Sequence, residues 1–138
     1  MEAESVVYTA GTWDLFHIGH LNIIRRARMF GTKLIVGVST DELVYSYKHH
    51  MPIMPYRERY EIIRELKCVD QVVQQSELLP VAQLFVLNAD ILVLGDDWKD
   101  SDLEGIAWMK YNKRMIFLPR TEGVSTSELK QKIRGKQC

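Results

Sequence analysis

The sequence predicts a single α/β domain over residues 1–138, built on a doubly wound, five-stranded parallel sheet. Short runs rich in β-branched and other apolar residues alternate along the chain with segments of helical periodicity. The strand candidates are almost continuously apolar, which is typical of strands buried on both faces of a parallel sheet. Right-handed crossovers then place helices on both faces. A length of 138 residues suits one such domain rather than two.

Five segments are expected to form the strands. They are residues 5–10 (SVVYTA), 33–39 (KLIVGVS), 70–74 (DQVVQ), 90–95 (DILVLG) and 114–119 (RMIFLP). In a doubly wound sheet, ligands bind at the carboxyl ends of the strands, where the strand order reverses. Segments with chemically active side chains follow four of the strands: GTWDLFHIGH, STDE, GDDW and RTEGVST. The sequence therefore predicts a site built from these connections.

Five segments have the apolar spacing of amphipathic helices. The first, HLNIIRRARMFG, places Leu21, Ile24 and Ala27 on one face and stops at Gly31, a helix C-terminal signal. The others are residues 56–66, 80–89 (which begin at a proline), 102–112 (which contain Gly105) and 125–133, capped by Ser125 or Thr126. The polar, proline-flanked stretch YSYKHHMP is expected to be a loop.

Composition excludes several classes of function. Eighteen basic residues balance eighteen acidic ones, so we expect neither a nucleic-acid partner nor a charged membrane surface. Apolar runs are far shorter than the ~20 residues that span a bilayer, and MEAESVV lacks the features of a signal peptide, so we expect no membrane anchor. Cys68, expected to pack against a helix end, and Cys138 show no metal-binding or CxxC spacing. A reducing, cytoplasmic setting is the expectation.

The stretch GTWDLFHIGH carries the strongest chemical signal. Gly11 after a strand predicts a tight turn, and the following helix directs unpaired N–H groups at the crevice. His17 and His20 lie three apart on one helix face, where imidazoles can donate to phosphate oxygens, and Gly19 leaves room for a ligand. Two histidines alone make an incomplete zinc site. Neither the P-loop nor the dinucleotide-binding pattern is present.

These residues point to a known family. GTWDLFHIGH resembles the GT-F-D-x-x-H-x-G-H signature of the cytidylyltransferase branch of the nucleotidylyltransferases, with Trp13 for the usual Phe. RTEGVSTS at 120–127 is similar to the second signature, R-T-x-G-[IV]-S-T-[TS], and GDDW at 95–98 resembles glycerol-3-phosphate cytidylyltransferases. The resemblance implies a Rossmann-like nucleotidylyltransferase fold. It also implies transfer of CMP from CTP to a small phosphorylated alcohol, glycerol-3-phosphate above all, with release of pyrophosphate.

The resemblance also implies roles for individual residues. Such a reaction needs little proton chemistry, because the attacking phosphate is already an anion, but it must align two polyanions. The catalytic residues would be His17 and His20 on the α- and β-phosphates, Lys48 on the transferring phosphate and Arg120 on the departing phosphates. Lys48 and Arg59 would bind the acceptor, although Arg59 would alternatively pair with Glu58 or Glu61. The nucleotide-binding residues would be Thr12, Trp13, Asp14, Gly19, Asp97, Thr121, Ser125 and Thr126.

Within this set, Asp14 is expected to organise the loop or the last helix, and Asp97 to accept a hydrogen bond from the cytosine amine. Ser125 and Thr126 have the alternative role of a simple helix cap. Mg²⁺ would accompany CTP, without a dedicated cage of carboxylates. The resemblance further implies a homodimer.

The acceptor and the nucleotide remain open at the level of the sequence. The stretch YKHHMPIM departs from the lysine-rich stretch of the glycerol-phosphate enzymes and resembles choline- and ethanolamine-phosphate cytidylyltransferases as well. For a cationic acceptor, Tyr45, Tyr47 and Tyr56 are candidate aromatic contacts. An ATP-using adenylyltransferase of the same superfamily and a non-catalytic CTP sensor are two further possibilities. A class I aminoacyl-tRNA synthetase is excluded because KMSKS and an anticodon-binding length are missing.

Overall fold

The computed structural model describes residues 3–135 and has a five-stranded sheet, all parallel, in the order β3-β2-β1-β4-β5. The predicted fold class is confirmed, and each predicted strand overlaps an observed one. Cys138 and the extreme ends of the predicted 1–138 domain lie outside the described residues. The strands are β1 (Val6–Gly11), β2 (Lys33–Ser39), β3 (Gln71–Gln75), β4 (Ile91–Gly95) and β5 (Met115–Leu118).

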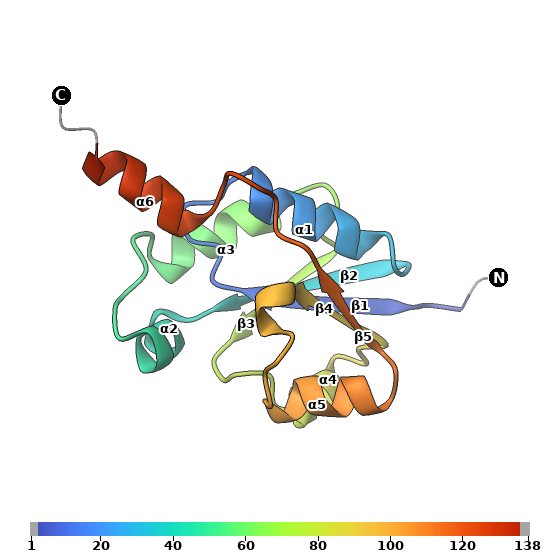
Figure 1. Ribbon diagram of the computed structural model, residues 1–138. Coiled ribbons are helices and arrows are strands. Elements are labelled where there is room, and N and C mark those ends of the chain that lie inside the picture. Colours follow the sequence, from blue (N-terminus) through green and yellow to red (C-terminus); the bar gives the residue numbers. More distant parts are fainter. Residues whose placement is uncertain (1–2, 136–138) are drawn as a thin grey trace.

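Helices cover both faces of the sheet (Figure 1). On one face α1 (Ile18–Arg28) and α3 (Tyr56–Arg64) pack, and on the other face α4 (Val81–Val86) and α5 (Glu104–Tyr111). Three further elements follow the carboxyl ends of β2, β4 and β5: α2 (Asp41–Lys48), the short 3₁₀ helix η1 (Asp96–Trp98) and α6 (Thr126–Gly135). The strand order reverses at β1, between β2 and β4, so these elements surround the switch point of the sheet.

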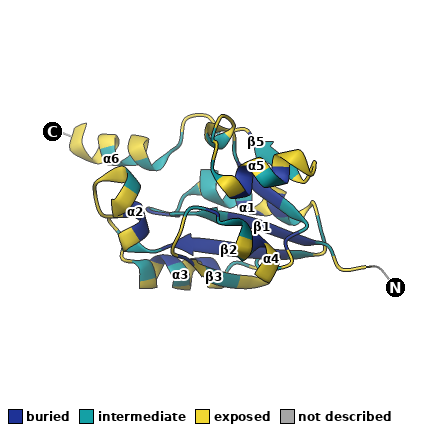
Figure 2. Cartoon of the chain, turned by 90° about the horizontal axis from the view of Figure 1, so that it is seen from below, coloured by how far each residue is buried: buried dark blue, intermediate teal, exposed yellow. Residues whose placement is uncertain are grey.

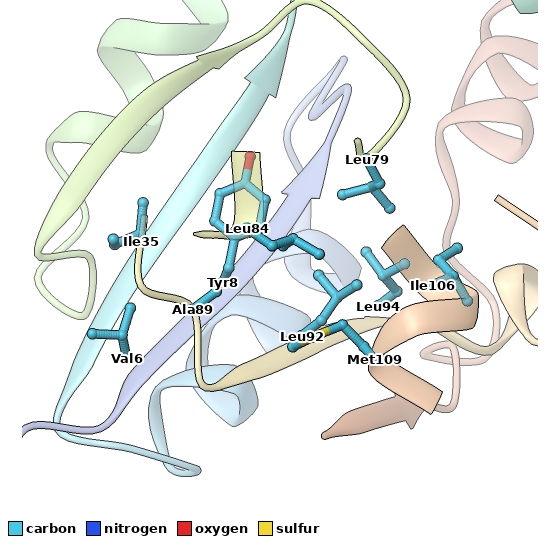
Figure 3. Packing of buried hydrophobic residues seen from close by; sticks show 10 residues of the cluster. All are labelled: Val6, Tyr8, Ile35, Leu79, Leu84, Ala89, Leu92, Leu94, Ile106 and Met109. Atoms are coloured by element: carbon cyan, nitrogen blue, oxygen red, sulfur yellow. The ribbon is translucent and has the colours of Figure 1, made fainter. Parts of the chain in front are cut away.

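The buried residues form two clusters, one on each face of the sheet, because side chains alternate along each strand. Figure 3 shows the cluster beneath α4 and α5, in which Tyr8, Leu92 and Met109 are fully buried. Gly105 of α5 belongs here. A Cβ at this position would lie 2.2 Å from the carbonyl oxygen of Leu79, so the glycine lets α5 approach closely. Each buried large side chain stabilises the fold by roughly 1.5–3 kcal/mol.

The three central strands, β1, β2 and β4, are mostly buried, the edge strands β3 and β5 are mostly half-buried or exposed, and α6 is largely exposed (Figure 2). Cys68 is half-buried and packs against the cluster on the α1 and α3 face. Between residues 3 and 135, no helix has the length and apolar character needed to cross a membrane. Helix α1 ends at Arg28, earlier than Gly31, because Met29 already serves as its C-cap.

The expectation of a loop over YSYKHHMP is wrong for its first half, which belongs to helix α2. The helix begins at Thr40, whose hydroxyl accepts the N–H of Leu43 at 3.0 Å, and acidic residues occupy its first turn. It ends at His49, which adopts the left-handed conformation with φ 61°. Lys48 is therefore the last residue of α2, so its backbone belongs to the helix and not to a loop.

Candidate active site

A cavity of about 570 Å³ lies at the carboxyl end of the sheet. The segments after β1, β2, β4 and β5 all contribute to it, as the switch-point rule predicts. Every predicted site residue except Arg59 lines this cavity: Thr12, Trp13, Asp14, His17, Gly19, His20, Lys48, Asp97, Arg120, Thr121, Ser125 and Thr126.

The two histidines stack at the start of α1, with ring centroids 3.8 Å apart. His17 caps the helix: its Nδ1 accepts the N–H of Gly19 at 3.0 Å, while His20 Nδ1 accepts the N–H of His17 at 3.3 Å. Because both Nδ1 atoms accept, the hydrogen-bond pattern assigns the hydrogen of each neutral ring to Nε2. Both rings therefore offer an Nε2–H donor. That of His17 is buried and has no hydrogen-bond partner among residues 3–135.

Both imidazoles are held in the neutral form at pH 7. Burial lowers the pKa of His20 to about 3, helped by the neighbouring His17 and Lys48 and opposed by Asp14. Burial also lowers the pKa of His17, with the carboxylate of Glu128 opposing it. The histidine pair thus supplies directed hydrogen-bond donors, and the positive charge of the site comes from lysine and arginine.

The turn between β1 and α1 is made by Trp13 and Leu15, which adopt φ values of 57° and 48°. Gly11, predicted to form this turn, instead ends β1, and a Cβ there would lie 3.0 Å from Trp13 Cε2. The glycine therefore makes room for the indole. Trp13 is buried, donates from Nε1 to the carbonyl of Gly37 at 2.9 Å, and contacts His20 edge to face.

Gly19 lines the cavity and also serves the packing of the neighbouring imidazole. A Cβ at this position would lie 2.8 Å from His17 Cε1. Any larger residue would therefore displace the capping imidazole.

Asp14 ties two loops together. Its buried carboxylate accepts the backbone N–H groups of Leu15 at 3.1 Å, Ile53 at 2.8 Å and Met54 at 2.9 Å. Three backbone donors occupy most of the lone pairs of this carboxylate, which suits a structural role better than that of a general base. The geometry supports the expectation that Asp14 organises the loop.

The C-terminal signature docks onto this first loop. Thr126 donates its hydroxyl hydrogen to the backbone carbonyl of Asp14 at 2.8 Å, and Asn22 Nδ2 donates to Thr121 Oγ1 at 2.9 Å. Ser125 is the cap of α6, since its Oγ accepts the N–H three residues later at 3.0 Å. Capping and site formation are thus carried out by the same short segment, which brings the start of α6 next to the start of α1.

Arg59 lies outside the cavity, and its side chain is fully buried. Its Nε donates to the Met54 carbonyl at 2.9 Å, and Nη1 donates to the carbonyls of Thr12 and Ser39, both at 2.7 Å. Its Nη2 pairs with Asp41 Oδ1 at 2.6 Å. The guanidinium therefore joins the ends of β1 and β2 to helices α2 and α3.

The predicted roles of Arg59 do not agree with this geometry. Its ion-pair partner is Asp41, whereas the sequence suggested Glu58 or Glu61. An acceptor phosphate is equally out of reach, because every nitrogen of the guanidinium is engaged and none lines the cavity. Arg59 supports the walls of the site from within the core.

Three cationic side chains line the cavity: Lys48 of α2, Arg120 after β5 and Lys130 of α6. Within residues 3–135, the side chains of Arg120 and Lys130 form neither an ion pair nor a hydrogen bond. Sequence reasoning missed Lys130. The sequence gives one indication of this residue. Lys130 comes four residues after Thr126 and therefore lies on the same face of the helix.

The part of the lining that comes from α2 and η1 contains aromatic and acidic side chains. Tyr47 of α2 and Trp98 of η1 pack edge to face, with ring centroids 6.5 Å apart. Asp97 lies beside Trp98, is exposed, and lines the cavity. Lys48 Nζ lies 5.8 Å from the centroid of the Tyr47 ring.

The cavity fits a metal ion that arrives with phosphate rather than one held by the protein. The described residues contain no cluster of three or more His, Cys, Asp or Glu side chains able to hold a metal. Among residues 3–135, only Asp14 and Asp97 contribute carboxylates to the lining, and Asp14 accepts three backbone N–H groups. Mg²⁺ commonly binds through substrate phosphates, water and one or two carboxylates, so Asp97 is the available protein ligand.

This fold, with histidines, cations and two helix starts around one cavity at the switch point, is that of a Rossmann-like nucleotidyltransferase. A lipopolysaccharide core biosynthesis protein from Thermoplasma volcanium has the same fold, with a TM-score of 0.75 and 23% identity over 87% of this chain and 100% of that chain. Residues 8–132 match the family described as Cytidylyltransferase-like, and the chain belongs to this family.

Relatives over nearly the full length support this placement. The glycerol-3-phosphate cytidylyltransferase of Bacillus subtilis (strain 168) is 35% identical over 130 residues, which cover 94% of this chain and 97% of that protein. The ethanolamine-phosphate cytidylyltransferase of Dictyostelium discoideum is 42% identical over 130 residues, covering 89% of this chain and 35% of that protein. The family resemblance seen in the signatures is confirmed.

Proposed function

We propose that this protein transfers CMP from CTP to glycerol-3-phosphate and releases pyrophosphate. The observation that carries the proposal is the convergence of His17, His20 and Arg120 on one cavity, although long stretches of sequence separate them. The near full-length match to the glycerol-3-phosphate enzyme of Bacillus subtilis supports the choice of substrates.

The chain's own groups suit an in-line displacement at phosphorus. A phosphate oxygen of the acceptor attacks the α-phosphorus of CTP, and the bond from this phosphorus to the oxygen bridging the α- and β-phosphates breaks. The Nε2–H donors of His17 and His20 would bind the α- and β-phosphate oxygens, where charge increases as pyrophosphate departs. Arg120 and the start of α6 would hold the departing phosphates.

The remaining groups would orient the two substrates. Lys48 would bring the acceptor phosphate and the transferring phosphate together, because it lines the cavity and its charge acts on His20. Asp97 would accept a hydrogen bond from the exocyclic amine of cytosine, and Trp98 would form a wall of the base pocket. Mg²⁺, carried by the triphosphate, would neutralise phosphate charge.

Phosphoethanolamine is the second candidate acceptor. It is favoured by the 42% identity to the Dictyostelium discoideum enzyme and by the aromatic pair Tyr47 and Trp98. A ring face suits an ammonium group, but Lys48 already places its own ammonium over the Tyr47 ring. Like charges repel, so this arrangement favours the uncharged glycerol end of glycerol-3-phosphate.

A pyrophosphate-release assay tests the proposal. It combines CTP, ATP, UTP and GTP with glycerol-3-phosphate, phosphocholine, phosphoethanolamine and FMN, all with Mg²⁺. We expect the highest kcat/KM for CTP with glycerol-3-phosphate. A higher value for another acceptor, or for ATP, would overturn the choice of substrate. Binding of CTP without pyrophosphate release from any pair would instead support a non-catalytic CTP sensor.

The proposal includes a cytoplasmic homodimer. Strand β3 lies at one edge of the sheet, and residues 65–70 connect it to α3. An edge strand offers unpaired backbone groups to a second copy. Light scattering should give twice the 16.1 kDa mass of one chain, and a monomeric mass would contradict the dimer.

A further inference from the structure

We propose that Gln75, held in place by the buried hydroxyl of Tyr8, binds the hydroxyl groups of the acceptor and selects a polyol phosphate over an amino-alcohol phosphate. The inference rests on the proposed function, because it assigns one part of the same cavity to the glycerol end of the acceptor. Neither signature contains these two residues: Tyr8 lies inside β1, and Gln75 is the last residue of β3.

Gln75 lies on the same side of the switch point as Lys48. Its strand β3 pairs with β2, and Lys48 ends the helix that follows β2. Asp97 and Arg120, which are assigned to the nucleotide, follow β4 and β5 on the other side of β1. Gln75 is only 2% exposed, and it lines the cavity. It therefore belongs to the part of the cavity that the acceptor would occupy beside Lys48.

The Tyr8 side chain fixes the direction of the Gln75 amide. It points toward the carboxyl ends of the strands (Figure 3), and its hydroxyl donates to Gln75 Oε1. Gly37 of β2 makes this contact possible, because a Cβ there would overlap with the Tyr8 hydroxyl. Burial raises the pKa of Tyr8, so the hydroxyl keeps its hydrogen at pH 7. On the other side of the amide, Gln75 Nε2 donates to the Glu77 carbonyl at 2.5 Å.

The hydrogen-bonding capacity that remains on the amide matches a hydroxyl group. A glutamine amide has two N–H hydrogens and two lone pairs on its oxygen, and Glu77 and Tyr8 use one of each. One donor and one acceptor therefore remain on the same planar group. A glycerol hydroxyl can use both, because it donates and accepts, whereas an ammonium group has donors only.

The neighbouring lining is uncharged. Ser39 of β2 is the register partner of Gln75; it is buried, lines the cavity and makes no side-chain hydrogen bond within the described part of the chain. Of the two carboxylates that this part contributes to the lining, Asp14 accepts three backbone N–H groups and Asp97 follows β4. An ammonium group would thus meet no free carboxylate beside Gln75, while a diol would meet a hydroxyl and an amide.

The experiment compares glycerol-3-phosphate with n-propyl phosphate, which has the same chain length but lacks both hydroxyl groups. The ratio of kcat/KM for the two acceptors, measured with CTP in the pyrophosphate-release assay, reports recognition of the hydroxyl groups, because both acceptors carry the same phosphate. It is determined for the wild type, Gln75→Leu, Tyr8→Phe and Gln74→Leu. Gln74 is exposed on the same strand and does not line the cavity, so its variant is the control.

In Gln75→Leu we expect this ratio to fall about tenfold, the effect of losing about one hydrogen bond to the acceptor, with KM for CTP unchanged. Tyr8→Phe keeps the Gln75 amide but removes the group that orients it, so the ratio should fall about threefold. Gln74→Leu should keep the ratio of the wild type.

Gln75→Glu tests the selection against an amino alcohol. A carboxylate at this position would attract the ammonium group of phosphoethanolamine, so the preference for glycerol-3-phosphate over phosphoethanolamine should fall about tenfold. An unchanged preference would contradict the position given to Gln75, beside the end of the acceptor that differs between the two compounds.

An unchanged ratio in Gln75→Leu, or an equal fall in Gln74→Leu, would overturn the proposal. Circular dichroism checks folding, and if Gln75→Leu does not fold, an unchanged ratio in Tyr8→Phe overturns the proposal in its place. A wild type that releases pyrophosphate with glycerol-3-phosphate, together with unchanged variants, refutes the role of Gln75 alone. If the wild type releases none with this acceptor, the proposed function fails, and the assignment of Gln75 to its hydroxyl groups fails with it.

Discussion

The hydroxyl of Thr126 donates a hydrogen bond to the backbone carbonyl of Asp14 across a separation of 112 residues in the sequence. The carboxylate of the same Asp14 accepts the N–H groups of Ile53 and Met54. A single residue thus joins the β1–α1 loop, the connection between α2 and α3, and the start of α6. The hydrogen bonds of Asp14 therefore hold these three segments together beside the cavity.

Thr126→Val should loosen the attachment of α6. Valine keeps the branched shape but removes the donor, which we expect to cost about 1 kcal/mol in the free energy of unfolding. Because Arg120 and Lys130 flank this attachment, KM for CTP should rise as well. Denaturant unfolding and the pyrophosphate assay measure the two effects. Thr126→Ser keeps the donor and should stay close to the wild type; equal losses in both variants would contradict this role of the hydroxyl.

Arg59→Met should destabilise the protein strongly. It leaves Asp41 and three backbone carbonyls without their donor, and breaking a buried ion pair costs roughly 3–5 kcal/mol. Arg59→Lys is expected to lose less, because lysine keeps the charge but lacks the planar array of donors.

The control for Arg59 is Arg64→Met, which removes the exposed pair with Glu61. Exposed pairs contribute about 0–1 kcal/mol. Urea denaturation gives the free energies of all three variants. A loss in Arg59→Met no larger than that in Arg64→Met would contradict the central role given to Arg59.

His17→Asn and His20→Asn should each lower kcat by about 10²–10³ while the fold persists, because each removes an Nε2–H donor to the phosphates. Asparagine at position 17 remains a good helix cap, so the variant separates catalysis from capping. His49→Asn, whose side chain is exposed and does not line the cavity, serves as the control. Circular dichroism checks folding. Rates within a few-fold of the wild type in both cavity variants would remove the histidines from the reaction.

His20 should make the protein less stable in mild acid. Its pKa falls from 6.5 to about 3 on folding, so below pH 6.5 the unfolded chain binds a proton that the folded chain does not. The free energy of unfolding therefore decreases as the pH falls, by up to about 1.4 kcal/mol per pH unit from this group.

Urea unfolding at pH 7.5, 6.5, 5.5 and 5.0, in the wild type and in His20→Asn, isolates this contribution. The difference between the two free energies should shift against the wild type below pH 6.5. A difference that stays constant across the series would show that His20 does not titrate in this way.

Asp97→Asn should weaken the preference for CTP over UTP by about tenfold, because the carboxylate accepts the cytosine amine hydrogen and repels the carbonyl oxygen that uracil has at the same position. Competition between the two nucleotides in the pyrophosphate assay measures the preference. Asp96→Asn is the matched control, since Asp96 is exposed and does not line the cavity. An unchanged preference in Asp97→Asn, or an equal change in Asp96→Asn, would refute the base-reading role.

The sheet was predictable because apolar strands carry their own local signal. Strand β2 was predicted at its observed limits, residues 33–39, and the other strands lie within one or two residues of expectation. The position of the cavity was predictable from the rule that ligands bind at the carboxyl ends of parallel strands. Helix α2 was missed although Thr40 and the acidic residues after it form a helix start, because the polar, proline-flanked end of YSYKHHMP is typical of a loop.

The roles of individual side chains were less accessible, because they depend on contacts between distant segments. No local feature of the sequence shows that Arg59 donates to the carbonyls of Thr12 and Ser39, which lie at the carboxyl ends of β1 and β2. Gly11 was expected to form the turn, but it ends β1 and makes room for the Trp13 ring, and no local signal shows that Gly19, besides lining the cavity, also accommodates the His17 ring. Lys130 carried a helical spacing signal, yet only the docking of α6 reveals which face meets the cavity.

The pairings of Asn22 with Thr121 and of Asp14 with Thr126 join segments 99 and 112 residues apart. During translation, the ribosome releases the histidine loop long before the segment that faces it. For most of its synthesis the nascent polypeptide therefore lacks the part of the cavity that Arg120 and the start of α6 line. The sheet must therefore form through its own packing. Bound CTP could stabilise the protein only after α6 has emerged from the ribosome.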